Sequence, residues 1–169
     1  LALLLLSGCA LPRFNVVRGS GVTTTRNYPI TGFTQVEVNS AFEATIRQGD
    51  TYAVQVTIDD NLLPYLVVEK VGDWLVIRYD TRQLTTFSSM RSEVAITLPA
   101  LTGIKASGAS QIRLMEMKTS GPLRITLSGA SRVTGDASVD SVMVDASGAS
   151  SLMLSGVVTS IDAELSGAS

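Results

Sequence analysis

Three carboxylate side chains near the end of the chain have a spacing that could support chemistry. Asp145 and Glu164 are separated by one period of a sequence repeat, and Asp162 lies two residues before Glu164. If their segments stack as neighbouring strands, these carboxylates lie close enough to work as acid and base on a glycoside or to hold a cation. The alternative is a solvated face on which Arg124 and Lys105 ease the repulsion. We favour the solvated face, because acidic residues most often lie on solvated surfaces.

The composition removes several classes of chemistry. The 169 residues include no histidine, the commonest general base and zinc ligand, so Ser–His and Cys–His catalytic pairs are impossible. Charged residues make up 17% of the chain and the net charge is −2. This balance provides no electrostatic attraction for nucleic acid. We therefore expect a protein without catalytic residues, cofactor, metal or nucleic-acid partner.

Asp59-Asp60-Asn61 is a second cluster of oxygen-bearing side chains, and Leu-Leu-Pro64 follows it. Such oxygens are calcium ligands, but their spacing does not match an EF-hand loop. The same residues are common in turns and at the start of a helical turn, which Pro64 would stop or bend. We favour the capped turn over the calcium site.

The chain begins with an apolar run that leads to its single cysteine, Cys9. The run is too short to span a bilayer and is typical of the end of a secretory signal, here without its start. Leu6-Ser7-Gly8-Cys9 resembles the lipobox of bacterial lipoproteins, which predicts a lipid on Cys9 that anchors the protein to a membrane. The alternative is an ordinary signal peptide with an unrelated cysteine. Ala10 favours delivery to the outer membrane in a Gram-negative host.

A repeated tetrapeptide, Ser-Gly-Ala-Ser, organises the second half of the chain. It begins at Ser107, Ser128, Ser147 and Ser166, so the intervals between copies are 21, 19 and 19. Apolar residues alternate on both sides of each copy, as in a strand with one buried face. A period of about 20 residues with this alternation predicts a solenoid, in which each repeat is one coil. We expect an all-β fold, a right-handed parallel β-helix with about 19–21 residues per coil.

The tetrapeptides are expected to form the turns between the two strands of each coil. Gly108, Gly129, Gly148 and Gly167 would supply backbone angles that a Cβ disfavours, and the serines would bond to nearby backbone. We expect the alanine to point inward. Exposed columns of serine hydroxyls that bind sugar, or a nucleophilic serine, are a weaker alternative because no base partner is present.

The first half of the chain predicts less regular strands. Setting Asn39 at the first position of the tetrapeptide places Val36, Val38, Ala44 and Ile46 inward, which indicates a degenerate first coil. Segments 66–70 and 74–79 flank a Gly72 turn and predict a β-hairpin.

Two further features of this half have both a structural and a functional interpretation. We interpret Trp74 as a plug of the core or of a sheet edge rather than as a platform for sugar. Residues 81–91 are predicted to form a polar loop, of the kind that often carries function on a rigid scaffold.

The domain organisation follows from these segments. Residues 1–9 are expected to be a truncated lipoprotein signal peptide, residues 10–20 a tether and residues 21–169 one β-helix domain. Because the chain stops inside a repeat, we expect the domain to continue beyond residue 169.

The order of several motifs resembles the head GIN domain, an adhesin-head family of bacterial envelope proteins. The residues that carry the resemblance are Gly32-Phe33, Val36-Glu37-Val38, Ala41-Phe42, Ile46, Gln48-Gly49-Asp50, Asp60 to Tyr65, Leu98-Pro99, Leu101, Ile104 and Ser107 to Ser110. The resemblance covers about residues 20–169. It implies a right-handed β-helical fold at the bacterial cell envelope, and it carries no catalytic residues.

Three functions remain as hypotheses. The first, which we favour, is a non-enzymatic, lipid-anchored envelope module that binds polysaccharide or another envelope protein through a β-helix face. The second is a structural spacer without a ligand. The third is a carbohydrate-active enzyme that uses Asp145, Asp162 and Glu164. Oligomeric state is not predicted.

Overall fold

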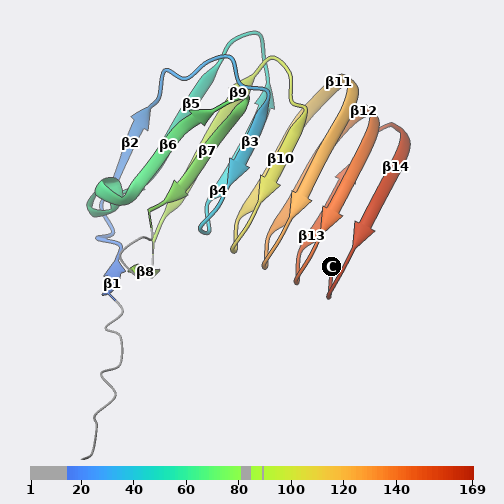
Figure 1. Ribbon diagram of the computed structural model, residues 1–169. Helices are drawn as coiled ribbons and strands as arrows, with labels where there is room; N and C mark the ends of the chain where they lie inside the picture. The colour runs from blue at the N-terminus through green and yellow to red at the C-terminus, as the bar shows by residue number, and fades with distance from the viewer. Residues whose placement is uncertain (1–14, 81–84, 89) are drawn as a thin grey trace, which may run out of the picture.

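The computed structural model describes residues 15–80, 85–88 and 90–169, and nearly all of its regular structure is strand (Figure 1). The strands are β1 (Asn15–Arg18), β2 (Thr23–Asn27), β3 (Gln35–Val38), β4 (Glu43–Gln48), β5 (Ala53–Asp59), β6 (Leu66–Val71), β7 (Trp74–Tyr79), β8 (Thr85–Ser88), β9 (Ser92–Leu98), β10 (Gly103–Ala106), β11 (Gln111–Leu127), β12 (Arg132–Ala146), β13 (Ser151–Ser155) and β14 (Val158–Leu165). The predicted helical turn is present as a 3₁₀ helix, η1 (Asp60–Tyr65), and Pro64 lies inside it. The prediction of an all-β fold is confirmed.

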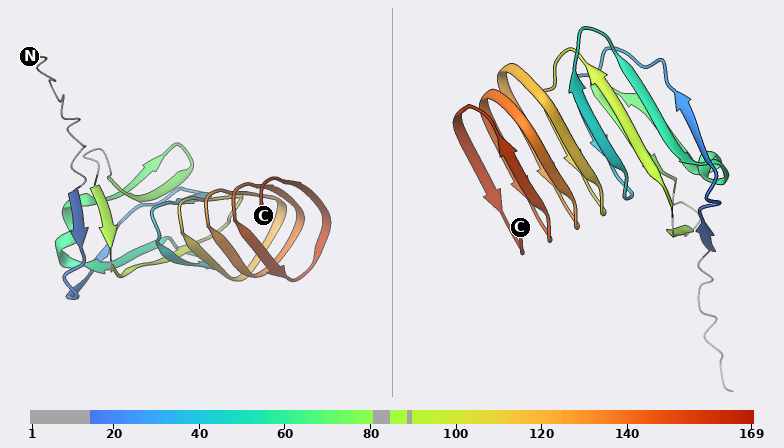
Figure 2. Two further views of the ribbon diagram at one scale, coloured as in Figure 1. Left: turned by 90° about the horizontal axis from the view of Figure 1, so that it is seen from below. Right: turned by 180° about the vertical axis from the view of Figure 1, so that it is seen from behind.

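Twelve strands form one open, curled sheet, and β1 pairs with β8 in a separate small sheet. Along the curl the order is β2-β5-β9-β4-β11-β10-β3-β7-β6, with β12, β13 and β14 continuing from β11. The two long strands β11 and β12 bend in the middle, so each contributes a first leg and a second leg to opposite walls of the curl (Figure 2). The buried apolar side chains lie between these walls.

The repeats pair in parallel with the register that their spacing predicts. In the first legs Gln111 pairs with Arg132 and Arg132 with Ser151, which are steps of 21 and 19. In the second legs Leu123 pairs with Val142 and Val142 with Ile161, both steps of 19. The two extra residues of the longer repeat are absorbed at the bend of β11, where the register shifts.

The prediction of a wholly parallel β-helix is not confirmed, because the sheet is mixed. Strand β5 runs antiparallel to both β2 and β9, and β6 runs antiparallel to β7 as the predicted hairpin. These antiparallel strands flank the parallel ones on both walls. The short connection between β6 and β7 requires antiparallel pairing, since a parallel pair needs a long crossover, while β5 pairs with strands far from it in the sequence. The non-repetitive first half therefore departs from the coil that the repeats follow.

The degenerate first coil is confirmed. Strands β3 and β4 pair in parallel with β10 and with the first leg of β11. Val36 lies beside Ile104 and Ala44 beside Ile112, and all four side chains are buried. Ser40 takes the place of Gly108 and has a positive φ of 68°.

In the turns, the residue that points inward is not the one that was predicted. The four glycines have φ between 70° and 77°, and each stacks on the turn of the preceding coil. The alanine does not point inward: Ala109, Ala130 and Ala149 are exposed. The fourth residue of the tetrapeptide points inward instead, because its hydroxyl can donate to a carbonyl of its own turn. Ser110 is fully buried, and its hydroxyl donates to the Ser107 carbonyl at 2.8 Å.

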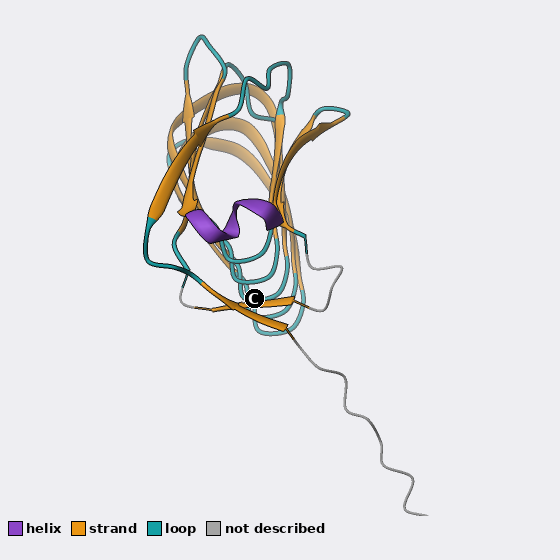
Figure 3. Cartoon of the chain, turned by 90° about the vertical axis from the view of Figure 1, so that its left-hand side faces the viewer, coloured by secondary structure: helices purple, strands orange, loops and turns teal. Residues whose placement is uncertain are grey.

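Aromatic side chains pack at the N-terminal end of the stack. Phe42 occupies the inward position of Ser110 and stacks on Tyr79, with ring centroids 4.7 Å apart. Phe87 packs on Tyr79 at 4.7 Å and against Tyr65 at 5.4 Å. In the view along the stack, η1 lies across this end (Figure 3).

This arrangement corrects two predictions. Residues 15–18 were expected to belong to a tether but form β1, which is paired with β8. Residues 85–88 were expected to belong to a loop but form β8, while positions 81–84 and 89 of that loop lie outside the described residues. We attribute the formation of β8 to packing, because Phe87, the aromatic residue of this polar segment, packs against Tyr65 and Tyr79.

Gly129→Ala should destabilise the protein more than Gly72→Ala. Both glycines have a positive φ, +70° and +59°, so both alanines carry the left-handed strain of about 1–2 kcal/mol. A Cβ at Gly129 would also lie 2.6 Å from the Gly108 carbonyl oxygen, whereas nothing lies within 4 Å at Gly72. Overpacking of that kind adds about 1–3 kcal/mol. Denaturant unfolding of both variants measures the difference, and equal losses would contradict the stacked-turn geometry.

Tyr79 should make the stability fall above pH 10. Burial raises the pKa of Tyr79 to about 12, with a smaller lowering from the Ser92 hydrogen bond of 2.8 Å and a smaller raising from the charge of Asp59. The fold favours the protonated phenol, so this stabilisation is complete below pH 10 and is lost as the pH rises towards 12. Tyr79→Phe cannot ionise. Unfolding at pH 9, 10 and 11 should show the wild type losing stability relative to this variant, and parallel curves would refute the effect.

Candidate binding face

The outward side chains of one wall form a regular grid, which we call the tryptophan face. It comprises the outward residues of β7, β3, β10, the second legs of β11 and β12, and β14. One row across these strands is Trp74, Gln35, Gly103, Arg124, Met143 and Asp162. The next row is Val76, Glu37, Lys105, Thr126, Asp145 and Glu164. The one-repeat spacing predicted to bring Asp145 beside Glu164 is therefore confirmed, and Lys105 and Arg124 lie in the same two rows.

Trp74 does not fill the core or a sheet edge, because Leu75 and Ile77 take the inward positions of β7 and β6 covers its free side. The Trp74 indole lies half-buried on the outer surface, and the Lys105 ammonium lies 4.2 Å from its ring centroid. This is a favourable cation–π contact. The ring edge faces Gly103, where a Cβ would lie 3.4 Å from Trp74 Cη2.

Two adjoining hollows follow the first row. The first, of about 250 Å³, is bordered by Trp74, Gly103, Thr102, Gln35, Pro122, Arg124 and Met143. The second, of about 270 Å³, is bordered by Arg124, Met143, Val144, Asp145, Asp162 and Glu164. Because they share Arg124 and Met143, they form one shallow trough across the strands, which we call the tryptophan trough. Gly103 is buried beneath the first half of the trough, where the missing side chain lets Gln35 and Trp74 approach its backbone, a feature that sequence reasoning did not single out.

The three predicted carboxylates lie together at one end of this trough. Asp145 pairs with Glu164 on the neighbouring strand, and Asp162 lies two residues along from Glu164. All three are exposed. The arrangement is suited to binding hydroxyl or cationic groups.

The serine hydroxyls of the turns do not form exposed columns. Ser110, Ser131 and Ser150 are buried, and the Ser131 hydroxyl donates to the Ser128 carbonyl at 2.9 Å, as Ser110 does within its own turn. The serines that open the first three turns are only partly exposed. The inward serines are therefore not available to bind sugar, because they are buried and their hydroxyls satisfy backbone carbonyls.

The Asp59-Asp60-Asn61 cluster ties chain segments together. The two carboxylate oxygens of Asp59, which is buried, accept from the backbone N–H groups of Gly21 and Arg91, each at 2.8 Å. Asp60 accepts from the Ser20 hydroxyl at 2.6 Å, and Asn61 donates to the Arg18 carbonyl at 2.8 Å. The predicted cap is not formed by Asp59. Its side chain makes no hydrogen bond to the backbone of η1, because its two oxygens already accept from Gly21 and Arg91.

Within the described ranges, no group of three or more Asp, Glu, His or Cys side chains is placed to hold a metal ion. In the same part of the chain, no helix is long and apolar enough to cross a membrane. Cys9 lies outside the described residues.

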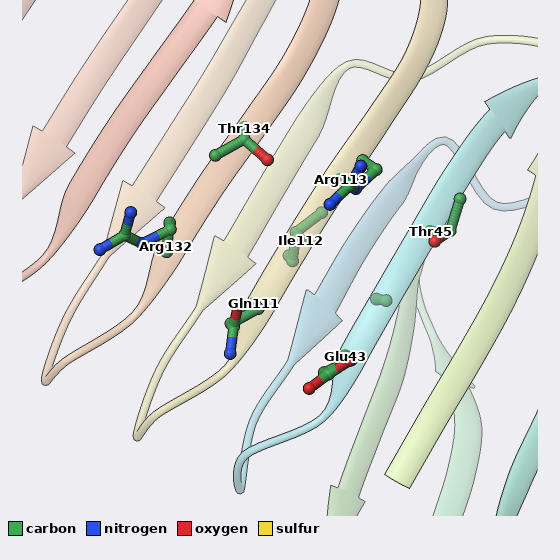
Figure 4. Close-up of a pocket in the computed structure, with 8 residues that line it drawn as sticks. Glu43, Thr45, Gln111, Ile112, Arg113, Arg132 and Thr134 are labelled. Atoms are coloured by element: carbon green, nitrogen blue, oxygen red, sulfur yellow. The ribbon is translucent and has the colours of Figure 1, made fainter.

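The opposite wall carries a different outward surface, the arginine face. We define it by the outward residues of β9, β4, the first legs of β11 and β12, and β13. A small hollow there, of about 90 Å³, is bordered by Glu43, Ala44, Thr45, Gln111, Ile112, Arg113, Arg132 and Thr134 (Figure 4). Sequence reasoning missed this face. The repeat spacing that predicted Asp145 beside Glu164 also places Gln111 beside Arg132.

Solved structures of bacterial proteins share the fold. A putative adhesin from Parabacteroides distasonis superposes with a TM-score of 0.66 at 19% identity, over 89% of this chain and 73% of that chain. A structure described as a putative lipid binding protein from the same organism gives 0.65 at 16% identity, over 90% and 76%. A putative adhesin from Parabacteroides merdae gives 0.62 at 17% identity, over 90% and 81%. At these identities the likeness shows the fold alone.

Among curated proteins no relative matches this chain. The family described as putative auto-transporter adhesin, head GIN domain, matches residues 32–169. This range includes both walls of the curled sheet, all four tetrapeptide turns and both outward faces, so the chain belongs to the head GIN domain family.

Proposed function

We propose that this protein is a non-catalytic module of the bacterial envelope that binds polysaccharide through its tryptophan trough. The observation that carries the proposal is the trough itself, which places an indole edge, a guanidinium and three carboxylates along one line of parallel strands. Membership of an adhesin-like family supports binding as the role and the envelope as its place.

The residues of the trough suit a sugar chain. Trp74 is half-buried and borders the first hollow, and its indole is an apolar surface on which the C–H groups of a sugar ring can pack. Gln35, Thr102, Arg124 and Asp145 offer donors and acceptors for hydroxyl groups. Side chains held on paired strands keep their spacing, which lowers the entropy cost of binding.

We propose a stiff, right-handed parallel β-helix for the stacked repeats that carry the trough. The parallel register of β10 to β14 supports this, and an experimental structure that shows the hand of the coils tests it. An envelope protein is the second candidate ligand for the same face, and a spacer without ligand is the third possibility.

Saccharide binding should change the fluorescence of Trp74, the only tryptophan in the chain. We expect a saturable change with one or more of a panel of capsular and cell-wall polysaccharides, without release of reducing ends. Gly103→Val should weaken binding at least tenfold, because the new side chain adds bulk between Gln35 and Trp74, which lie within 3.4 Å of its Cβ and border the hollow. Thr126→Val adds no bulk inside either hollow and is the matched control.

Other outcomes decide between the hypotheses. Reducing-end release that disappears in Asp145→Asn or Glu164→Gln would replace the binding module with an enzyme. No fluorescence change with any polysaccharide would favour a spacer or a protein ligand.

We propose that a lipid on Cys9 anchors the module to the outer membrane, on the basis of the Leu6-Ser7-Gly8-Cys9 motif. Cys9→Ser should abolish signal processing and metabolic labelling with a fatty acid. The protein should then no longer be found in the outer-membrane fraction. Wild-type fractionation and labelling of Cys9→Ser would refute the anchor.

A further inference from the structure

Three arginines lie on one straight diagonal of the arginine face. Arg47 on β4 pairs with Met115 on β11, and Arg113 lies two residues before Met115. Arg113 pairs in turn with Thr134 on β12, and Arg132 lies two residues before Thr134. Each step moves one strand across and two residues back, a distance of about 8 Å between Cα atoms for strands about 4.8 Å apart.

All three arginine side chains are exposed and free of carboxylates. Within the ranges that the structure describes, none of the three makes a hydrogen bond or ion pair through its guanidinium group. Arg91 and Arg78 show the contrast, since each has a glutamate partner, at 2.7 Å and 3.5 Å. A line of unpaired cations on a rigid sheet can bind a line of anions without first breaking internal contacts.

Hydrogen-bonding groups fill the positions beside the diagonal. Gln111 lies next to Arg132, and Thr134 lies next to Arg113, so an amide and a hydroxyl complete the square between these two arginines. Figure 4 shows these groups around the small hollow between the strands. Its volume of about 90 Å³ is close to that of three water molecules, enough for one carboxylate or sulfate group.

The carboxylates of this face lie off the diagonal, and one of them, Glu93 on β9, is paired with Arg91. Glu43 is beside Gln111 on β4, and it borders the same hollow. Asp136 lies at the other end of the first leg of β12, and the Ser155 hydroxyl donates to it. An anionic chain that follows the arginines therefore passes between Glu43 and Asp136, which restrict its direction.

We propose that the diagonal of Arg47, Arg113 and Arg132 binds an acidic polysaccharide, one that carries carboxylate or sulfate groups. The spacing of about 8 Å between steps lets each arginine meet a separate charge of a regularly charged chain. This site is on the opposite wall from Trp74 and does not depend on the tryptophan trough. The protein would then hold two polysaccharide chains, or two parts of one, on its two faces.

A nucleic acid fits this face less well. It carries a phosphate at every nucleotide, so some of its charges would meet Glu43 and Asp136. Proteins that bind single strands also stack bases on aromatic side chains. No outward residue of the arginine face, as its paired strands define it, is aromatic.

Retention of the full chain on immobilised polymers tests the proposal. Polygalacturonate and dextran sulfate should retain the protein at low salt and release it at high salt, because exposed ion pairs are screened. Neutral dextran should not retain it. The triple variant R47Q/R113Q/R132Q should bind about 10- to 100-fold more weakly, since an exposed ion pair contributes a factor of about 2–5.

A matched variant separates the diagonal from net charge. R18Q/R26Q/K70Q removes the same three charges from β1, β2 and β6, far from the diagonal, and should bind like the wild type. Glu43→Gln removes the carboxylate that borders the hollow and should strengthen binding about two- to fivefold. This gain does not depend on whether the triple variant folds.

Several outcomes would overturn the proposal. They are equal losses in the two triple variants, no gain in Glu43→Gln, no retention on either acidic polymer, or retention on DNA as strong as on polygalacturonate. The fluorescence of Trp74 keeps this test apart from that of the tryptophan trough. Retention without a fluorescence change supports the arginine site alone, and a fluorescence change without loss in R47Q/R113Q/R132Q supports the trough alone.

Discussion

The stacking of one turn on the next is the constraint on which the rest of this structure depends. The N–H of Ala130 donates to the Gly108 carbonyl at 2.7 Å, and the same bond recurs from Ala149 to Gly129 and from Ala168 to Gly148 at 2.8 Å. These bonds require the turns to approach so closely that a Cβ on the upper glycine would collide with the carbonyl below. Once the turns are stacked, the register of both legs follows, and every side chain is assigned to the inside or the outside.

The regular stack separates the task of folding from the task of recognition. Inward rows must be apolar or internally satisfied, as Ile104, Ile125 and Val144 are, or as Ser110 is through its own turn. Outward rows carry no such requirement, so their side chains can differ from coil to coil without disturbing the core. One wall consequently carries an indole and carboxylates, while the other carries the arginine diagonal. Within the repeats, neighbouring side chains of either face come from segments one repeat apart in the sequence.

The N-terminal end of the stack needs a different solution, because β7 and β9, which pair there with β3 and β4, are not joined by a tetrapeptide turn. Phe42 replaces the inward serine and joins Tyr79 and Phe87, which supply bulk where the coil would otherwise be open. Asp59 then holds Gly21 and Arg91 against this end through their backbone N–H groups. A buried carboxylate that accepts two such bonds is stabilised in place of the water it has lost.

The sequence alone determined the part of this protein that repeats. The spacing of the tetrapeptides and the alternation around them were sufficient to predict the strands of the repeats and their parallel register. They also predicted the degenerate first coil around Asn39 and the position of Asp145 beside Glu164. They were not sufficient for the rest, because pairing between dissimilar segments leaves no periodic trace. Only the tertiary structure decided that β3 lies between β7 and β10, that β5 runs antiparallel to β9, and that Trp74 borders Gly103. It also decided that serine rather than alanine turns inward, since a hydroxyl can satisfy a carbonyl of its own turn and a methyl group cannot.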